Sequence, residues 1–148
     1  MTIAAALLGE HALLYTQFDY LEQALLDRMT LSQVHCQAGM LRAALESHAH
    51  LEDELLFAPL EPYLGEVNPL AVMRGEHCGI ERALATLPQI VDLSRARAGL
   101  LFVIEVARQH CAREEQAVYS LANQLLGSKE SNRLRHRWAM RRGIYHYY

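Results

Sequence analysis

The sequence predicts an all-α protein: an up-down-up-down four-helix bundle followed by a short C-terminal fifth helix. Three observations favour this fold class. Apolar residues recur at three- and four-residue spacing over long stretches, which is the period of one helix face. No stretch shows strand-like alternation of useful length. Proline, asparagine and glycine separate four long amphipathic segments by short connections, as is typical of antiparallel bundles.

Length and composition are those of one ordinary globular domain. The 148 residues are 51% hydrophobic and 21% charged, which is enough for a real hydrophobic core. Cys36, Cys78 and Cys111 are an odd number at no paired spacing, which argues against a disulfide framework. No apolar run approaches the ~18 residues of a membrane span, and Glu10 and His11 interrupt the early run that a signal peptide needs. We therefore expect a cytoplasmic protein with no membrane partner.

The first two helices are expected over about residues 3–28 and 30–57. The apolar stripe of the first helix has a histidine in its middle: Leu7, His11, Leu14, Phe18, Leu21 and Leu25. Thr30 or Ser32 can cap the second helix. Three residues that disfavour helix are expected to break it and to form the longest loop: Pro59, Pro62 and Gly65.

Two further long helices are expected after that loop. Asn68 and Pro69 combine a cap residue with proline at the first helical position, so the third helix starts there and ends at Pro88. Its stripe is Leu70, Met73, His77, Ile80 and Leu84. The fourth helix begins between Asp92 and Arg97 and ends at the Gly127–Ser128 pair. Its stripe includes Leu100, Val103, Ala107, His110, Glu114 and Leu121.

Charge divides the chain into an acidic body and a basic end. Residues 1–128 carry 8 Arg against 16 acidic residues, whereas residues 129–148 carry one Lys and five Arg against Glu130. We assign the first range to the bundle and the second to a basic C-terminal helix or tail. Leu134, Trp138 and Ile144 are interspersed among its arginines, which favours a helix docked on the acidic body over a nucleic-acid partner.

Each long helix has a histidine near the middle of its apolar stripe: His11, His48, His77 and His110. Of the seven histidines with a residue four positions on, four are followed there by glutamate. Residues four apart lie on one face of a helix, so an imidazole and a carboxylate at this spacing can reach one metal ion. Ionised carboxylates are almost never buried unless paired or bound to metal. The sequence therefore favours a cation site in the bundle core over a buried His–Glu hydrogen-bond network.

The stretch SHAHLEDELLFAP contains two overlapping HxxxE frames. His48 and Glu52 continue an apolar stripe with large residues on both sides, Leu41, Leu45 and Leu55. His50 and Glu54 follow Ala43 and Ser47, a pattern more typical of a solvated face. We expect His48 and Glu52 to point inward and His50, Asp53 and Glu54 to lie outside.

These segments resemble the hemerythrin-like, or HHE, cation-binding domain. The resemblance rests on the order H…HxxxE…H…HxxxE over four helices and spans about residues 5–125. It is carried by Glu10-His11 and by residues 48–57 (HAHLEDELLF), 73–80 (MRGEHCGI) and 110–119 (HCAREEQAVY). The HxxxE segments with their trailing aromatics, Phe57 and Tyr119, are fairly specific, whereas isolated EH dipeptides are not. The position of Phe57 also selects the inward frame.

The resemblance implies a non-haem di-iron centre with an oxo or hydroxo bridge. It would make Glu52 and Glu114 bridging ligands and the four stripe histidines terminal ligands: His11, His48, His77 and His110. Coordination counting then leaves about two positions open to an exogenous ligand. Zinc is the less favoured metal, although histidine and glutamate also suit it.

The chain departs from the oxygen-carrying members of that family on its third helix. Those proteins have a second histidine one turn from the first, but here Met73 and Glu81 flank His77. Glu81 either replaces that histidine as an additional ligand or lies at the surface. We expect binding or sensing of O2, NO or iron, with an enzyme acting on peroxide or nitric oxide as the alternative.

Three side chains next to the expected ligands have separate expectations. Cys78 and Cys111 each follow a ligand histidine by one residue and are turned about 100° away, so we expect buried structural cysteines, with redox sensing as the alternative. Tyr15, one turn after His11, is a candidate second-shell hydrogen-bond donor or ligand. The sequence does not specify an oligomeric state.

Overall fold

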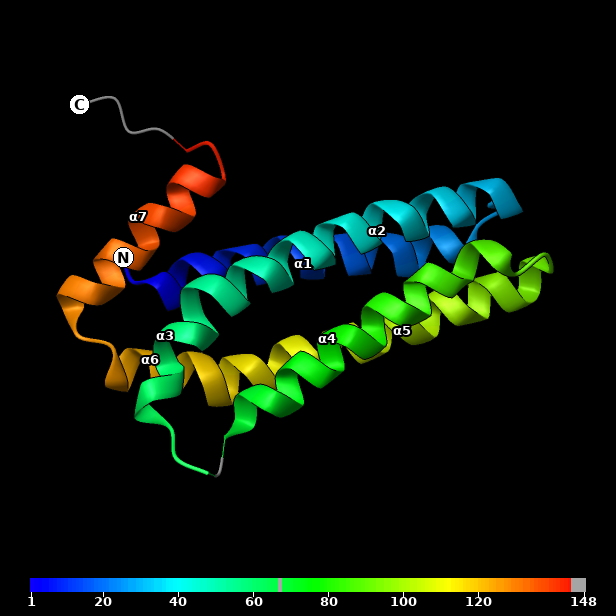
Figure 1. Ribbon diagram of the computed structural model, residues 1–148. Coiled ribbons are helices and arrows are strands. Elements are labelled where there is room, and N and C mark those ends of the chain that lie inside the picture. The colour runs from blue at the N-terminus through cyan, green and yellow to red at the C-terminus, as the bar shows by residue number, and fades with distance from the viewer. Residues whose placement is uncertain (67, 145–148) are drawn as a thin grey trace.

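A computed structural model of the chain describes residues 1–66 and 68–144. The described residues are helical, contain no strand, and form a four-helix bundle whose long helices run alternately up and down (Figure 1): α1 (Ile3–Leu26), α2 (Leu31–Glu52), α4 (Pro69–Thr86) and α5 (Leu93–Glu114). The four long helices form a closed bundle, because α1 and α4 each pack against both α2 and α5. A fifth helix, α7 (Ser128–Arg141), packs on α1. The predicted all-α bundle with a short C-terminal helix is confirmed.

Side-chain caps set the starts of all four long helices, and at α1 the Thr2 hydroxyl accepts from the backbone N–H of Ala5. The Thr30 hydroxyl accepts from the backbone N–H of Gln33, whose side chain accepts in turn from the Thr30 N–H, so α2 begins with a capping box. Asn68 and Asp92 cap α4 and α5. Within the described part of the chain, no helix is both long and apolar enough to cross a membrane.

The two helices that carry HxxxE motifs both continue through a π-helical turn. These turns span Asp53–Phe57 and Glu115–Tyr119 and lead into the short helices α3 (Ala58–Leu60) and α6 (Ser120–Leu125). In a regular α-helix, a residue five positions after a glutamate would be rotated by about 140° from it. A π turn has i→i+5 hydrogen bonds, so Phe57 and Tyr119 return to the faces of Glu52 and Glu114.

The prediction that Pro59 breaks the second helix is wrong. The helix passes through Pro59, and a 3₁₀ turn at Glu61–Tyr63 follows before the loop begins at Leu64. The N–H of Ala58 already bonds to the carbonyl of Asp53, five residues back. This wider turn accommodates the proline ring, which in a regular helix would clash with the carbonyl four residues before it.

Two apolar clusters fill the bundle, one on each side of a central polar layer. One cluster lies towards the α1–α2 and α4–α5 connections and includes Phe18, Leu41, Leu84 and Leu100. The other lies towards α3, α6 and α7 and includes Leu7, Leu55, Leu70, Val118 and Leu134. Charged groups in the layer between them are therefore shielded from water on two sides, which strengthens their mutual electrostatic interactions.

The C-terminal helix docks on the acidic body, as the sequence indicates. Leu134 is fully buried, and Trp138 is packed against the apolar cluster near α3. Arg137 and Arg141 both donate to Glu54. Ile144, expected to dock as well, is 42% exposed because α7 ends at Arg141 and Gly143 (φ 67°) redirects the chain. The aromatic end, residues 145–148, lies outside the described residues.

The three cysteines are free and differ in burial. Cys111 is buried as expected, Cys36 is exposed, and Cys78 is exposed, contrary to the expectation of a structural role. The difference between Cys78 and Cys111 follows from packing. α5 contacts α1, α2 and α4 and buries a wide face, whereas α4 buries only a narrow stripe, so a residue turned about 100° from His77 faces solvent.

Candidate metal centre

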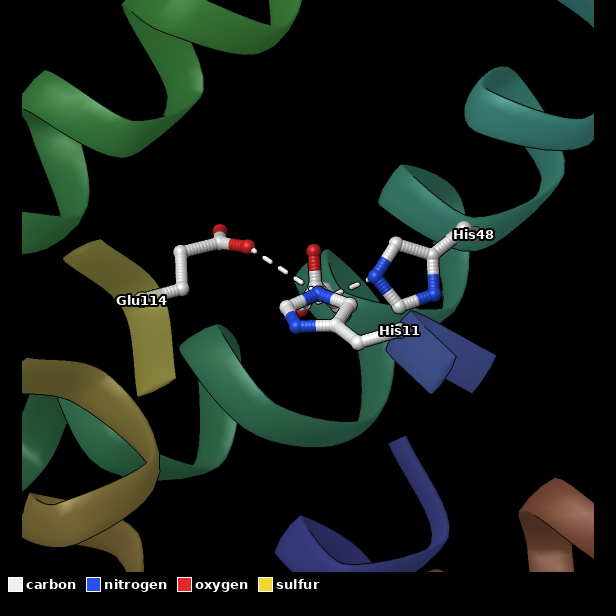
Figure 2. A group of neighbouring side chains, drawn as sticks. His11, His48 and Glu114 are labelled. Carbon is white, nitrogen blue, oxygen red and sulfur yellow. Dashed lines mark ion pairs between the residues drawn. The ribbon is translucent and has the colours of Figure 1, made fainter. Parts of the chain in front are cut away.

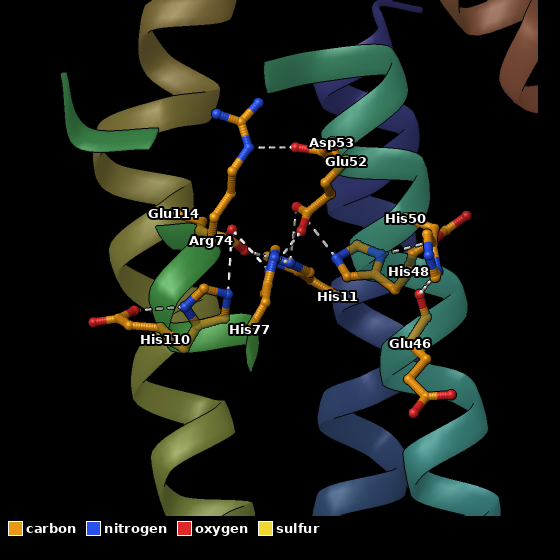
Figure 3. A network of polar contacts seen from close by, with 12 residues as sticks. His11, Glu46, His48, His50, Glu52, Asp53, Arg74, His77, His110 and Glu114 are labelled. Atoms are coloured by element: carbon orange, nitrogen blue, oxygen red, sulfur yellow. Dashed lines mark hydrogen bonds and ion pairs between the residues drawn. The ribbon is translucent and has the colours of Figure 1, made fainter. Parts of the chain in front are cut away.

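Six side chains converge in the polar layer from all four long helices. α1 contributes His11, α4 contributes His77, and α2 and α5 contribute one HxxxE pair each: His48 with Glu52, and His110 with Glu114. Figure 3 shows these side chains facing one another across the bundle axis. Five of them are buried, and the sixth, His77, has a side chain 12% exposed. The structure thus brings together all six residues that the sequence analysis selected.

Each glutamate spans two pairs of histidines with its two carboxylate oxygens. Glu52 Oε1 lies 3.2 Å from His48 Nε2 and 3.7 Å from His11 Nε2, while Oε2 lies 3.3 Å from His77 Nε2. Glu114 faces the same two histidine pairs, but it has one contact with the His11–His48 pair and two with the His77–His110 pair. Its Oε2 lies 3.5 Å from His11 Nε2 (Figure 2), and its Oε1 lies 3.4 Å and 3.2 Å from the Nε2 atoms of His77 and His110.

The converging atoms form two overlapping groups of possible ligands. One group is His11, His48, Glu52 and Glu114, and the other is Glu52, His77, His110 and Glu114. Both glutamates belong to both groups, whereas each histidine pair belongs to one. Each group has enough nitrogen and oxygen donors to hold a metal ion.

The hydrogen bonding of the six side chains also fits a metal site. Among the described residues, the buried His48 Nε2, His110 Nε2, Glu52 Oε2 and both Glu114 carboxylate oxygens lack a hydrogen-bond partner. Buried polar atoms in folded proteins nearly always have a partner. With metal–ligand bonds of about 2.1 Å, two donors on one ion lie roughly 3.0–3.4 Å apart. Four of the six observed nitrogen–oxygen separations, 3.2–3.4 Å, match that spacing, and the two that involve His11, at 3.5 Å and 3.7 Å, are slightly longer.

Without metal, the cluster is held together by ion pairing between imidazolium and carboxylate. Burial disfavours the charged form of His48, but the attraction of Glu52 and the hydrogen bond to Glu10 outweigh it and raise its pKa to about 10. Desolvation also disfavours the charged form of His77, but Glu114 and Glu52 outweigh it and raise the pKa of His77 to about 9. Desolvation raises the pKa values of Glu52 and Glu114, but their contacts with the surrounding histidines outweigh it and lower both. A cation would replace these protons with equivalent charge.

Three of the four histidines donate a hydrogen bond from their second ring nitrogen, Nδ1, to a carboxylate. His48 Nδ1 lies 2.7 Å from Glu10, His110 Nδ1 lies 2.6 Å from Glu76, and His11 Nδ1 lies 2.9 Å from Glu115. With the proton on Nδ1, the lone pair of Nε2 points into the centre. Such carboxylate partners fix the tautomer and ring orientation of metal-binding histidines.

The glutamates of the two EH dipeptides are therefore functional positions that the sequence analysis missed. In each dipeptide the histidine enters the centre, and the preceding glutamate reaches the HxxxE histidine of the neighbouring helix. The available signal was that both helices with a single central histidine place glutamate immediately before it, Glu10-His11 and Glu76-His77.

Glu10 also links the centre to the C-terminal helix. Its carboxylate accepts from Trp138 Nε1 and from the Arg142 guanidinium, in addition to His48. Burial opposes ionisation, but these hydrogen bonds outweigh it and lower the pKa of Glu10 to about 2. Docking of the C-terminal helix thus helps keep the partner of one candidate ligand charged.

The remaining candidates lie around the centre rather than in it. Tyr15 donates to Glu115 Oε1, at 2.9 Å, and so reaches His11 only through that carboxylate. Glu81 is partly buried beside a small cavity lined by His77 and His110, and it belongs to neither ligand group. The second HxxxE frame, which begins at His50, points away from the centre. His50 is exposed, and its ring bonds to the Glu46 carbonyl.

The two halves of the centre differ at their aromatic residues. Phe57 stacks on His77 with the ring planes 3° apart, whereas Tyr119 stacks on His11 and presents a hydroxyl. That hydroxyl lies 3.0 Å from His11 Nε2 and 2.5 Å from Glu52 Oε1. In the sequence Tyr119 is recognisable only as the aromatic residue that follows the HxxxE motif, because nothing in the sequence indicates the π turn that rotates it inward.

We expect Glu10→Gln to weaken metal binding by about 10- to 100-fold, the usual effect of losing a carboxylate behind a ligand histidine. The amide keeps the size of the side chain but removes the charge that orients His48. Competition against a chelator of known affinity measures the change. Glu76→Gln should have a similar effect through His110.

The matched control is Glu130→Gln, because Glu130 is paired only with Arg133 on the surface of the C-terminal helix. Its metal affinity should equal that of the unmodified protein. Affinity within twofold of the unmodified protein in both Glu10→Gln and Glu76→Gln would show that these carboxylates do not orient ligands.

Comparison with known proteins agrees with this geometry. The family model described as the hemerythrin HHE cation binding domain matches residues 2–122, a range that contains all six converging side chains. Neither the search of curated proteins nor the search of solved structures found a match. The chain belongs to the hemerythrin HHE cation-binding domain family.

Proposed function

We propose that this protein binds two iron ions in its polar layer and uses them to bind or sense a small ligand, O2 or NO. Residues 1–128 form the metal-binding unit in this proposal, and residues 129–148 form a basic helix that covers one side of it. The free cysteines agree with a reducing, cytoplasmic location.

The observation that carries this proposal is the sharing of Glu52 and Glu114 between two histidine pairs. Each pair forms a separate ligand group, which favours one ion for each pair. A hydrogen-bond network without metal would not leave five buried nitrogen and oxygen atoms of these side chains unsatisfied.

Iron is the metal that we propose for the site. Imidazole combined with carboxylate is the donor set of non-haem iron sites that keep positions open for a ligand. Each ion would have two histidine nitrogens and two carboxylate oxygens, which is fewer than the six donors of an octahedral site. Zinc accepts four such donors as a complete tetrahedral shell and would have no position for O2 or NO.

The chain's own residues define where a small ligand would approach. A small cavity between α2, α4 and α5 is bordered by His77, His110 and the partly buried Glu81. His77 is the most exposed of the six converging side chains, so the His77–His110 half is the more accessible one. The apolar clusters on both sides of the layer exclude water from the rest of the centre.

Rapid mixing of the reduced, iron-loaded protein with NO or O2 tests the proposed binding role. We expect a visible spectrum that persists after mixing and reverses when the gas is removed. Zinc-loaded protein is the control and should give no spectrum. Continuous consumption of NO or of added peroxide without a persistent spectrum would contradict the binding role and support a di-iron enzyme.

A further inference from the structure

The Tyr119 hydroxyl lies within the ligand group of only one of the two proposed ions. It lies 3.0 Å from His11 Nε2 and 2.5 Å from Glu52 Oε1, and both atoms belong to the group of His11, His48 and the two glutamates. The 3.0 Å separation from His11 Nε2 is that of neighbouring donors on one ion, and the shorter one is a hydrogen bond that the Tyr119 hydroxyl donates to Glu52. Tyr119 is 4% exposed, so its oxygen is held in this position away from solvent.

Two features of the fold fix the position of Tyr119. The π turn at Glu115–Tyr119 returns the side chain to the face of Glu114, and stacking on His11 fixes the ring at a centroid distance of 5.0 Å. The equivalent π turn on the other HxxxE helix ends in Phe57, which has no donor atom and stacks on His77.

We propose that Tyr119 is an additional ligand, as phenolate, of the ferric ion held by His11 and His48, which makes the two metal positions unequal. This inference rests on the proposed di-iron function. On coordination the O–H bond breaks, the electron pair stays on the phenol oxygen, and the proton leaves to solvent, so no external oxidant or reductant is needed.

The difference between the two metal positions also indicates which ion binds the exogenous ligand. The ion held by His11 and His48 has five protein donors, whereas the ion held by His77 and His110 has four, because Phe57 replaces the tyrosine. The small cavity beside Glu81 is lined by both histidines of the second ion, His77 and His110, but by only one histidine of the first, His48. A small ligand therefore binds first at the His77–His110 ion.

Resonance Raman spectroscopy of the ferric, iron-loaded protein tests the assignment. We expect a visible phenolate-to-iron charge-transfer band whose excitation enhances tyrosinate ring vibrations, and growth on ring-deuterated tyrosine should shift these vibrations. Tyr119→Phe should lose the band and the vibrations while keeping two irons per chain, because the ring and its stacking remain.

Tyr15→Phe is the matched control, since Tyr15 lies one turn from His11 but donates only to Glu115. It should keep both the band and the vibrations. Two irons per chain without tyrosinate vibrations in the unmodified protein would overturn the proposal for Tyr119 and leave the di-iron centre intact. Persistence of the vibrations in Tyr119→Phe would overturn it as well. Failure of the unmodified protein to bind iron would instead overturn the proposed function.

Discussion

Glu52→Ala and Glu114→Ala are each expected to reduce bound metal from two ions per chain to at most one. Each glutamate faces both histidine pairs, so its removal takes one donor from each of the two ligand groups. The loss of Glu52 also removes one of the two carboxylates that face each of His48 and His77 in a buried layer. Metal analysis of each variant after saturation with iron measures the effect, and circular dichroism checks that the bundle remains folded.

Glu46→Ala is the control on the same helix, because Glu46 pairs through its side chain only with Arg42. This variant should retain two ions per chain. Two ions per chain in either Glu52→Ala or Glu114→Ala would refute the assignment of these carboxylates as shared ligands.

Metal loading is expected to raise the melting temperature at pH 7 by roughly 10 °C. Ligand that binds only the folded state stabilises it by ~4 kcal/mol when its free concentration is a thousand times Kd. For a chain of about 150 residues, each kcal/mol shifts the midpoint by about 2–4 °C. Thermal unfolding followed by circular dichroism, with and without metal, measures the shift.

This stabilisation by metal should increase from pH 6 to pH 9. The folded, metal-free protein holds protons on His48 and His77, whose pKa values are raised to about 10 and about 9. Raised pKa values stabilise the metal-free fold fully below the unfolded pKa of about 6.5 and lose that effect as pH passes the folded values. Metal must displace the same protons, so its binding strengthens as pH rises over this interval.

His50→Ala serves as the control for the thermal measurement, and His48→Ala serves as its counterpart. The two histidines are two residues apart on α2, but only His48 points into the polar layer, whereas His50 is exposed. The shift on metal loading should persist in His50→Ala and become smaller in His48→Ala, which removes a ligand from only one of the two groups. An equal shift in both variants would contradict the choice between the two overlapping HxxxE frames.

The sequence was sufficient to predict the features that depend on helical periodicity alone. Apolar stripes located the four long helices, and two cap candidates, Thr30 and Asn68, begin α2 and α4. The start of α5 was predicted only between Asp92 and Arg97, and Asp92 caps it. The same stripes separated His48 from His50, because the two side chains project from different faces of one helix.

Features that depend on contacts between helices could not be predicted in the same way. The bond between Glu10 and His48 joins α1 and α2, and the bond between Glu76 and His110 joins α4 and α5. Cys78 and Cys111 occupy equivalent sequence positions but differ in burial, because α5 has neighbours on more sides than α4. The π turns were not predicted either, and they decide that Phe57 and Tyr119 face the centre.

The number and identity of the metal ions in the purified protein test the central claim most directly. Elemental analysis combined with quantitative amino-acid analysis gives both values for the full chain, as isolated and after anaerobic loading with ferrous iron. Two shared carboxylates and two histidine pairs predict two irons per chain at saturation. A plateau at one ion per chain, or zinc that ferrous iron does not replace, would contradict the account.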